Sequence, residues 1–137
     1  MKKESLKLSQ QIYRLLVSAA EKEKPLEACG ILGGTAKKVR QFYPMTNMDK
    51  SSESYSMDPW EQFKVLEELR RKGWDIAGIW HSHLHTPPCP STRDKELAFT
   101  PETSYVILSL APGHYGEIRS FYREKSGNLV EEDIVMV

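Results

Sequence analysis

Two histidines, two positions apart, follow an apolar run in the middle of the chain. His81 and His83 come directly after Ile76–Trp80. If this run is a buried strand, alternate side chains point to one face, and the two imidazoles project side by side. Asp94 follows beyond a proline-rich loop. Two imidazoles and one carboxylate form the three-ligand set of an open zinc site, whose fourth position is left to water.

The same residues also have simpler explanations. A His-x-His pair often occurs by chance, and Ser91 with Asp94 three positions later resembles the capping box of a short helix. Cys89 lies in the same loop, but we do not expect it to be a fourth ligand, because hydrolysis needs an open position. We leave His85 out of the ligand set, since the proline-rich loop should end the strand before it.

The order of these residues resembles the signature of the JAMM, or MPN-plus, metalloproteases. In that family an upstream glutamate, here Glu27, precedes His-Ser-His, here residues 81–83, and Ser-x-x-Asp follows seven residues later. The segment around Glu27 resembles the family's Pro-x-Glu-x-Cys-Gly. The chain departs from the pattern at Leu84, where proline is common. The resemblance extends over nearly the whole chain and looks like that of the stand-alone prokaryotic members.

The resemblance implies a fold and a division of roles. The fold is a single α/β domain over residues 1–137, with a mixed sheet flanked by helices in three layers, as in the cytidine deaminases. Glu27 becomes the catalytic carboxylate, which takes a proton from water and returns it to the leaving amine. Ser91 becomes a hydrogen-bond donor to the oxyanion. One Zn²⁺ per chain is implied, with the ligands His81, His83 and Asp94.

The substrate expected from the resemblance is a protein tail. Eukaryotic members remove ubiquitin and often carry an insertion after the metal-binding aspartate, whereas only a short stretch separates Asp94 from Pro101 here. Compact prokaryotic members act on ubiquitin-like sulfur-carrier proteins that end in Gly-Gly. We therefore expect hydrolysis of the amide bond after such a Gly-Gly terminus. Isopeptide cleavage, precursor trimming and release of an attached amino acid such as cysteine all stay open.

The sequence lacks the signatures of two other classes of zinc site. A zinc nucleobase deaminase needs His-x-Glu and Cys-x-x-Cys, and a zincin needs His-Glu-x-x-His; the sequence has none of these. Two alternatives of another class remain. A small β-barrel metal-binding module would lack the helices expected at residues 10–22 and 59–72. A non-catalytic MPN scaffold that docks protein partners would usually lack the ligands, which are all present here.

Composition limits the remaining classes. The 137 residues suffice for one domain with its own core. Lys plus Arg and Asp plus Glu both number 19, so zero net charge gives no case for nucleic acid or a membrane surface as partner. Cys29 and Cys89 are too few for a disulfide framework and fit a reducing cytoplasm. We expect no signal peptide or membrane span, and the sequence does not indicate the oligomeric state.

Hydrophobic periodicity and turn residues predict the elements that position the site. Helices are expected at residues 10–22, 59–72 and 91–99. Phe63, Leu66 and Leu69 form the expected inner stripe of the second helix. Gly33-Gly34 should form a turn, and residues 47–56 a polar surface loop beside the cleft. Strands are expected at residues 5–8, 28–32, 38–45, 74–80, 104–111, 117–123 and 129–137.

Overall fold

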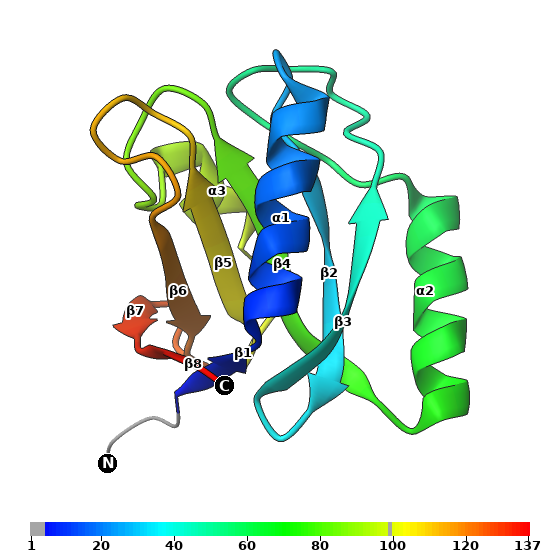
Figure 1. Cartoon of the computed structure of the whole chain (residues 1–137). Coiled ribbons are helices and arrows are strands. Elements are labelled where there is room, and N and C mark those ends of the chain that lie inside the picture. Colours follow the sequence, from blue (N-terminus) through cyan, green and yellow to red (C-terminus); the bar gives the residue numbers. More distant parts are fainter. Residues whose placement is uncertain (1–4, 99) are drawn as a thin grey trace.

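Helices cover both faces of one mixed sheet in the computed structural model, which describes residues 5–98 and 100–137 (Figure 1). The expected three-layer α/β fold is confirmed. The helices are α1 (Gln10–Glu23), α2 (Pro59–Lys72) and α3 (Thr92–Leu97). The strands are β1 (Leu6–Leu8), β2 (Cys29–Thr35), β3 (Lys38–Met45), β4 (Asp75–His83), β5 (Ser104–Ser109), β6 (Ile118–Arg123), β7 (Leu129–Glu132) and β8 (Ile134–Met136).

The sheet has the strand order β7-β6-β5-β4-β2-β3-β1-β8. Strand β4 lies in its interior, antiparallel to β2 and parallel to β5. The strand predicted at 129–137 is wrong as a single element, because it divides at Asp133 into β7 and β8 on opposite ends of the sheet order. The Asp133 carbonyl accepts a hydrogen bond from Leu6, which draws β8 to β1. The sheet must therefore curl until its two ends meet at Asp133.

Each face of the sheet has its own apolar core. The first core packs α1, through Ile12, Leu16 and Ala20, against Trp80. Leu84, the departure from the family's proline, is buried in this same core. The second core packs α2 on the opposite face and includes Ile31, Tyr43, Tyr55 and Leu69. Burial of both faces explains why β4 and β5 are apolar with little alternation.

Helix α2 presents a different face to the sheet from the predicted one. Of the predicted stripe only Leu69 is buried, and Phe63 and Leu66 are exposed. Val65, four residues before Leu69, packs beside it, because residues i and i+4 share a helix face. The ends of the helix are as predicted: Asp58 caps the first turn by accepting from the Trp60 amide, and Gly73 ends the helix in the left-handed conformation.

The glycine pair lies within a strand and not in a turn, so that expectation is wrong. Both glycines belong to β2, where the pairing with β3 shifts register between Gly33 and Gly34. A Cβ on Gly34 would lie 1.9 Å from the Lys38 carbonyl oxygen, so the close approach of the two backbones requires glycine. The turn falls at Ala36 and Lys37, which both have positive φ angles.

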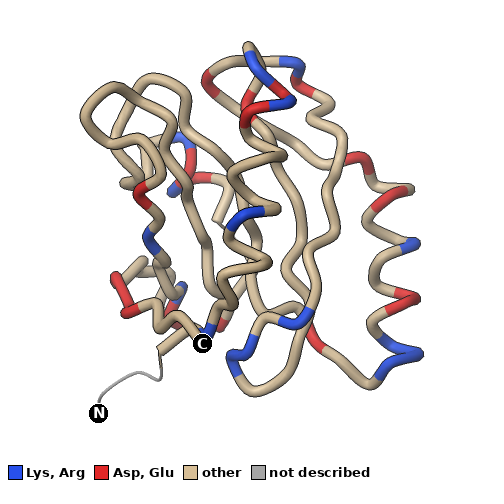
Figure 2. Tube along the Cα trace, viewed as in Figure 1, with Lys and Arg blue, Asp and Glu red and all other residues tan. Residues whose placement is uncertain are grey.

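Positions occupied by basic and by acidic residues are interspersed along the backbone trace, on α2 as well as on the loops (Figure 2). This arrangement matches the zero net charge of the sequence. Within residues 5–98 and 100–137, every helix is too short or too polar to cross a lipid bilayer.

Candidate metal centre

Strand β4 delivers both histidines into the interior at its carboxyl end. His81 is paired with Cys29 of β2 and Ile107 of β5, and His83 with Ser109 of β5. The two residues are only 2% and 4% exposed. Because they are two positions apart on one strand, their rings project from the same face, as the sequence predicted.

The third potential ligand comes from the first turn of α3. Ser91 caps this helix: its Oγ accepts from the Asp94 amide at 3.0 Å, while its own amide donates to Asp94 Oδ2 at 2.9 Å. The capping box expected from the sequence is thus present. It holds the buried Asp94 carboxylate facing the histidines, so the capping role and a ligand role are compatible.

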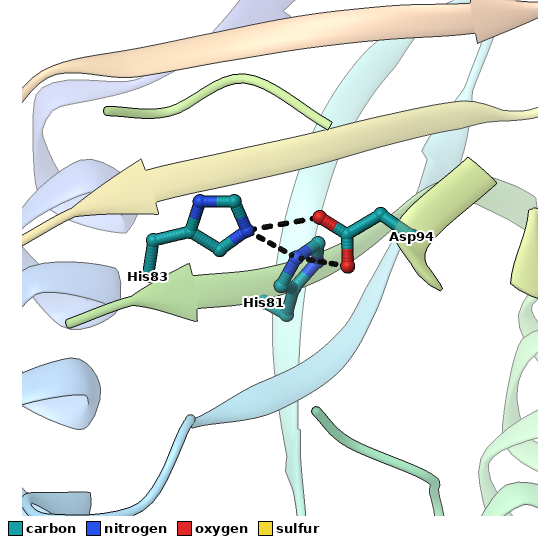
Figure 3. A group of neighbouring side chains, drawn as sticks. All are labelled: His81, His83 and Asp94. Atoms are coloured by element: carbon teal, nitrogen blue, oxygen red, sulfur yellow. Dashed lines mark hydrogen bonds and ion pairs between the residues drawn. The ribbon is translucent and has the colours of Figure 1, made fainter. Parts of the chain in front are cut away.

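The three side chains converge on one point (Figure 3). His81 Nε2 and His83 Nε2 are 3.2 Å apart, Asp94 Oδ1 lies 3.2 Å from His81 Nε2, and the other carboxylate oxygen, Oδ2, lies 2.9 Å from His83 Nε2. A tetrahedral zinc ion holds nitrogen and oxygen ligands at about 2.0–2.1 Å, which separates the ligand atoms by about 3.3–3.4 Å. The spacings between each pair of side chains are close to this value, so the three side chains are placed to share one metal ion.

The proline-rich loop fixes the orientation of His83. Its Nδ1 lies 2.9 Å from the Pro87 carbonyl oxygen, and Thr86 Oγ1 lies 3.0 Å from the same nitrogen. A carbonyl only accepts, so Nδ1 carries a proton, and Nε2 is the nitrogen that would offer its lone pair to a metal. Ser109 Oγ donates to the Thr86 carbonyl at 2.7 Å and ties this loop to β5.

The electrostatics favour the metal-binding protonation states of His81 and Asp94. Burial lowers the pKa of His81, so its imidazole is held neutral. Burial opposes ionisation of Asp94, but the hydrogen bonds with His81 and His83 outweigh it and keep the pKa of this carboxyl below its usual range. At His83, burial lowers the pKa, but the hydrogen bonds with Asp94 and the Pro87 carbonyl outweigh it and hold the pKa above its usual value. Neutral imidazole and ionised carboxylate are the ligand forms that zinc requires.

Glu27 lies just before β2, beside this group. The residue is 3% exposed, and its Oε1 has no hydrogen-bond partner among the described residues. Burial raises its pKa to about 8. Glu27, His83 and Ser91 line one cleft of about 530 Å³, with residues 51–54 of the following loop on its wall. A buried carboxyl without a partner, facing a potential metal site, has the surroundings of an acid–base group.

Ser82 and the neighbouring residues have supporting or peripheral positions. Ser82 points to the other face from the histidines, and its Oγ accepts from the Ala28 amide at 2.8 Å. Among the described residues, the side chains close enough to share a metal are His81, His83 and Asp94. Cys89 and His85 are exposed and lie outside that group, in agreement with the sequence analysis.

Two buried residues of the loop at 47–56 were not predicted from the sequence. Tyr55 stacks on His81 with ring centroids 4.6 Å apart, and Asn47 is a buried hydrogen-bonding centre. The available signal was weak: Tyr55 and Met57 are large apolar residues two positions apart in a polar segment. In an extended segment, residues two positions apart point to the same side, so this spacing indicates that Tyr55 and Met57 both point into the protein.

Comparisons with known proteins agree with this geometry. Residues 9–124 match the family described as prokaryotic homologues of the JAB domain. The CysO-cysteine peptidase of Mycobacterium tuberculosis is 34% identical over 128 residues, covering 92% of this chain and 87% of the relative. The desampylase of Haloferax volcanii is 36% identical over 90 residues, covering 64% and 65%. A Desulfitobacterium hafniense protein of known solution structure superposes with a TM-score of 0.85 at 38% identity, covering 96% and 92%.

Proposed function

The chain belongs to the family of prokaryotic JAB-domain homologues, and from this premise we propose that it is a zinc-dependent peptidase of sulfur-carrier or ubiquitin-like proteins. The bond that it hydrolyses is the amide after the carrier's C-terminal Gly-Gly. The observation that carries the proposal is the convergence of His81, His83 and Asp94 beside the buried carboxyl of Glu27.

The metal-binding role is assigned to the three converging side chains. His81 and His83 would each offer Nε2, and Asp94 a carboxylate oxygen. A zinc ion held there would supply two effects, acidification of a water molecule and polarisation of the scissile carbonyl. The remaining polar contacts of these ligands, to Pro87 and Ser91, keep them oriented toward one another before any metal binds.

Glu27 is assigned the proton transfers of amide hydrolysis. The carboxylate takes the proton of the attacking water and then gives it to the nitrogen of the leaving amine. A pKa raised by burial suits both tasks, because the group must gain and lose a proton near neutral pH. A scaffold that only docks partners would not need a buried carboxyl of this kind, and this favours the enzyme over the scaffold.

Ser91 is assigned the stabilisation of the oxyanion. Its Oγ accepts the capping hydrogen bond from Asp94, and an accepting hydroxyl still has its own proton to donate. The residue is exposed on the cleft that Glu27 lines. The hydroxyl proton is thus available to the carbonyl oxygen as its negative charge develops.

The substrate class comes from the relatives. One is named a CysO-cysteine peptidase and another a desampylase, and these names point to conjugates of sulfur-carrier or ubiquitin-like proteins. A Gly-Gly tail offers no side chains, and recognition then depends on backbone hydrogen bonds and on narrow walls. The loop at residues 51–54 supplies such a wall beside Glu27. We place the reaction in the cytoplasm, where the free Cys29 and Cys89 would stay reduced.

The proposed activity is tested with defined carrier adducts. The purified zinc-loaded protein is incubated with a carrier whose Gly-Gly terminus bears cysteine, a lysine isopeptide or a C-terminal extension. Mass spectrometry should show the carrier regenerated with a free Gly-Gly carboxylate from at least one adduct, and the preferred adduct identifies the attached group. Failure to cleave any of the three, with zinc bound, would exclude the proposed substrate class.

A further inference from the structure

Asn47 is a buried polar residue whose side chain is hydrogen-bonded to the backbone of Glu27. We propose that Asn47 is a positioning residue: it fixes the loop at residues 47–57 in the one shape that holds Glu27 in place. The proposal rests on the proposed function for the catalytic role of Glu27. The contacts between the loop and Glu27 are independent of that function.

The side chain of Asn47 is the hydrogen-bonding centre of its loop. The residue is 3% exposed. Its Nδ2 donates to the carbonyl oxygens of Glu27 at 3.0 Å and Ser54 at 2.9 Å, with a longer contact to Ser51 at 3.4 Å. Its Oδ1 accepts from the Asp49 amide at 3.0 Å and, more weakly, from the Ser56 amide at 3.4 Å. One amide thus joins both arms of the loop to the segment that carries Glu27.

Both backbone groups of Glu27 depend on this loop. Its amide donates to the Ser51 carbonyl at 2.9 Å, and its carbonyl accepts from Asn47. Glu27 precedes β2, which begins at Cys29, so ladder hydrogen bonds of the sheet do not hold it. The next residue, Ala28, is held separately by Ser82, through the Ser82 hydroxyl and amide. The backbone position of Glu27 therefore depends on its hydrogen bonds to the loop.

The carboxyl of Glu27 lacks a side-chain anchor that could replace this support. Its Oε1 has no hydrogen-bond partner among the described residues, although the side chain is buried. The direction of the carboxyl therefore follows from its backbone and from packing. A displacement of about 1 Å in a catalytic group costs on the order of 10²-fold in rate. Loss of the Asn47 contacts should accordingly appear in catalysis.

The same loop also reaches the predicted metal ligands. Tyr55 stacks on His81, and the isolated bridge between Asn47 and Met57 closes the loop around Tyr55. The Met48 amide donates to the Ser56 carbonyl at 2.8 Å, which joins the two arms once more. Asn47 thus stands at the base of a segment that touches the acid–base residue on one side and a ligand on the other.

The test is a double-mutant cycle between Asn47→Ala and Glu27→Gln, in zinc-loaded protein with the best adduct. In the chain with Glu27, we expect Asn47→Ala to lower kcat by about 30–100-fold with KM changed less than about threefold. In the Glu27→Gln background the same change should cost less than about threefold, because no base remains to be positioned. If the alanine variant does not fold, Asn47→Asp replaces it in the cycle. This variant can still accept hydrogen bonds from the Asp49 and Ser56 amides, but it loses the donor to the Glu27 carbonyl.

Hydrogen exchange of the Glu27 amide, followed by NMR with and without zinc, tests directly whether Asn47 holds the backbone of Glu27. The Glu27 amide should be protected in the unsubstituted protein and should exchange at least about tenfold faster in Asn47→Ala. The matched control is Ser56→Ala. It removes the hydroxyl bond to Asp49, 2.8 Å long, from the same loop but leaves the bonds of Asn47. Neither the kcat nor the Glu27 exchange of this control should change.

Three results would overturn the inference. Equal losses in both backgrounds would make Asn47 a general stabiliser of the fold. A rise in KM with kcat unchanged would make Asn47 a substrate contact. An unchanged exchange rate of the Glu27 amide in Asn47→Ala would show that Asn47 does not hold Glu27 in place. If the unsubstituted protein cleaves no adduct, the proposed function fails by itself, and the exchange measurement alone decides whether Asn47 holds Glu27.

Discussion

Replacing Glu27 with glutamine should stabilise the zinc-free protein, and the gain should grow with pH. Burial raises the pKa of this carboxyl from 4.5 to about 8. Below pH 4.5 the group is protonated in the folded and unfolded chains alike, and it costs nothing. As the pH rises, the unfolded chain releases its proton first, so folded-state stability is lost until the folded pKa near 8 is passed.

The size of this effect follows from the two pKa values. Each pH unit between them lowers the free energy of unfolding by about 1.4 kcal/mol, which amounts to about 3 kcal/mol at pH 7. Glutamine has nearly the same shape and does not titrate, so Glu27→Gln removes the pH-dependent loss. The growth of the stability difference is the quantity to compare, because the buried amide has a desolvation cost of its own at every pH.

Urea unfolding of chelator-treated protein at pH 5, 6, 7 and 8 measures the difference. Zinc is removed because a cation beside the cleft would favour the ionised carboxylate. Glu53→Gln is the matched control, since it neutralises an exposed carboxylate that lines the same cleft, and it should show no comparable growth. A stability difference between Glu27→Gln and the unsubstituted protein that stays constant from pH 5 to 8 would refute this reasoning. In that case the pKa of the Glu27 carboxyl would not be raised by burial.

Three further predictions concern catalysis. Glu27→Gln in the zinc-loaded enzyme should keep its zinc and lose about 10²–10⁴-fold in kcat; activity within a few-fold of the unsubstituted enzyme would make Glu27 a bystander. Ser91→Ala should keep zinc, because the Ser91 amide still donates to Asp94, and should lose up to about 10²–10³-fold in kcat; an unchanged kcat would remove Ser91 from the oxyanion role. For carriers that end in Gly-Ala or Ala-Ala in place of Gly-Gly, kcat/KM should fall at least about tenfold per added methyl group, or about 1.4 kcal/mol. Equal cleavage of the Gly-Gly, Gly-Ala and Ala-Ala carriers would exclude a narrow groove.

The shared face of His81 and His83 and the cap that Asp94 forms could be predicted because they depend on local rules. Strand alternation puts two histidines on one face, and a capping box turns the aspartate of a helix's first turn back toward its start. Both rules operate over a few residues, whereas the meeting of Asp94 with the two histidines across the loop was implied by the family resemblance. The roles of Glu27 and Ser91 came from the family resemblance, and they stay predictions until the variants are measured.

The features that were missed depend on contacts between distant segments. Asn47 looks like any polar loop residue until the fold brings Glu27 within hydrogen-bonding distance of it. Gly34 marks a close approach of β2 to β3, which only the strand pairing reveals. Strand β8 separates from β7 because β1, at the other end of the chain, offers it a partner. Periodicity within a segment contains no information about such partners.

Zinc content measured together with cleavage tests the central claim most directly. The unsubstituted protein should contain one zinc per chain, lose cleavage of a carrier adduct on chelation, and regain it when zinc is added back. His81→Ala, His83→Ala and Asp94→Ala should each lose zinc and cleavage together, because each removes one of the three converging ligand atoms. Full zinc occupancy in all three variants, or undiminished cleavage by the chelated protein, would contradict the account.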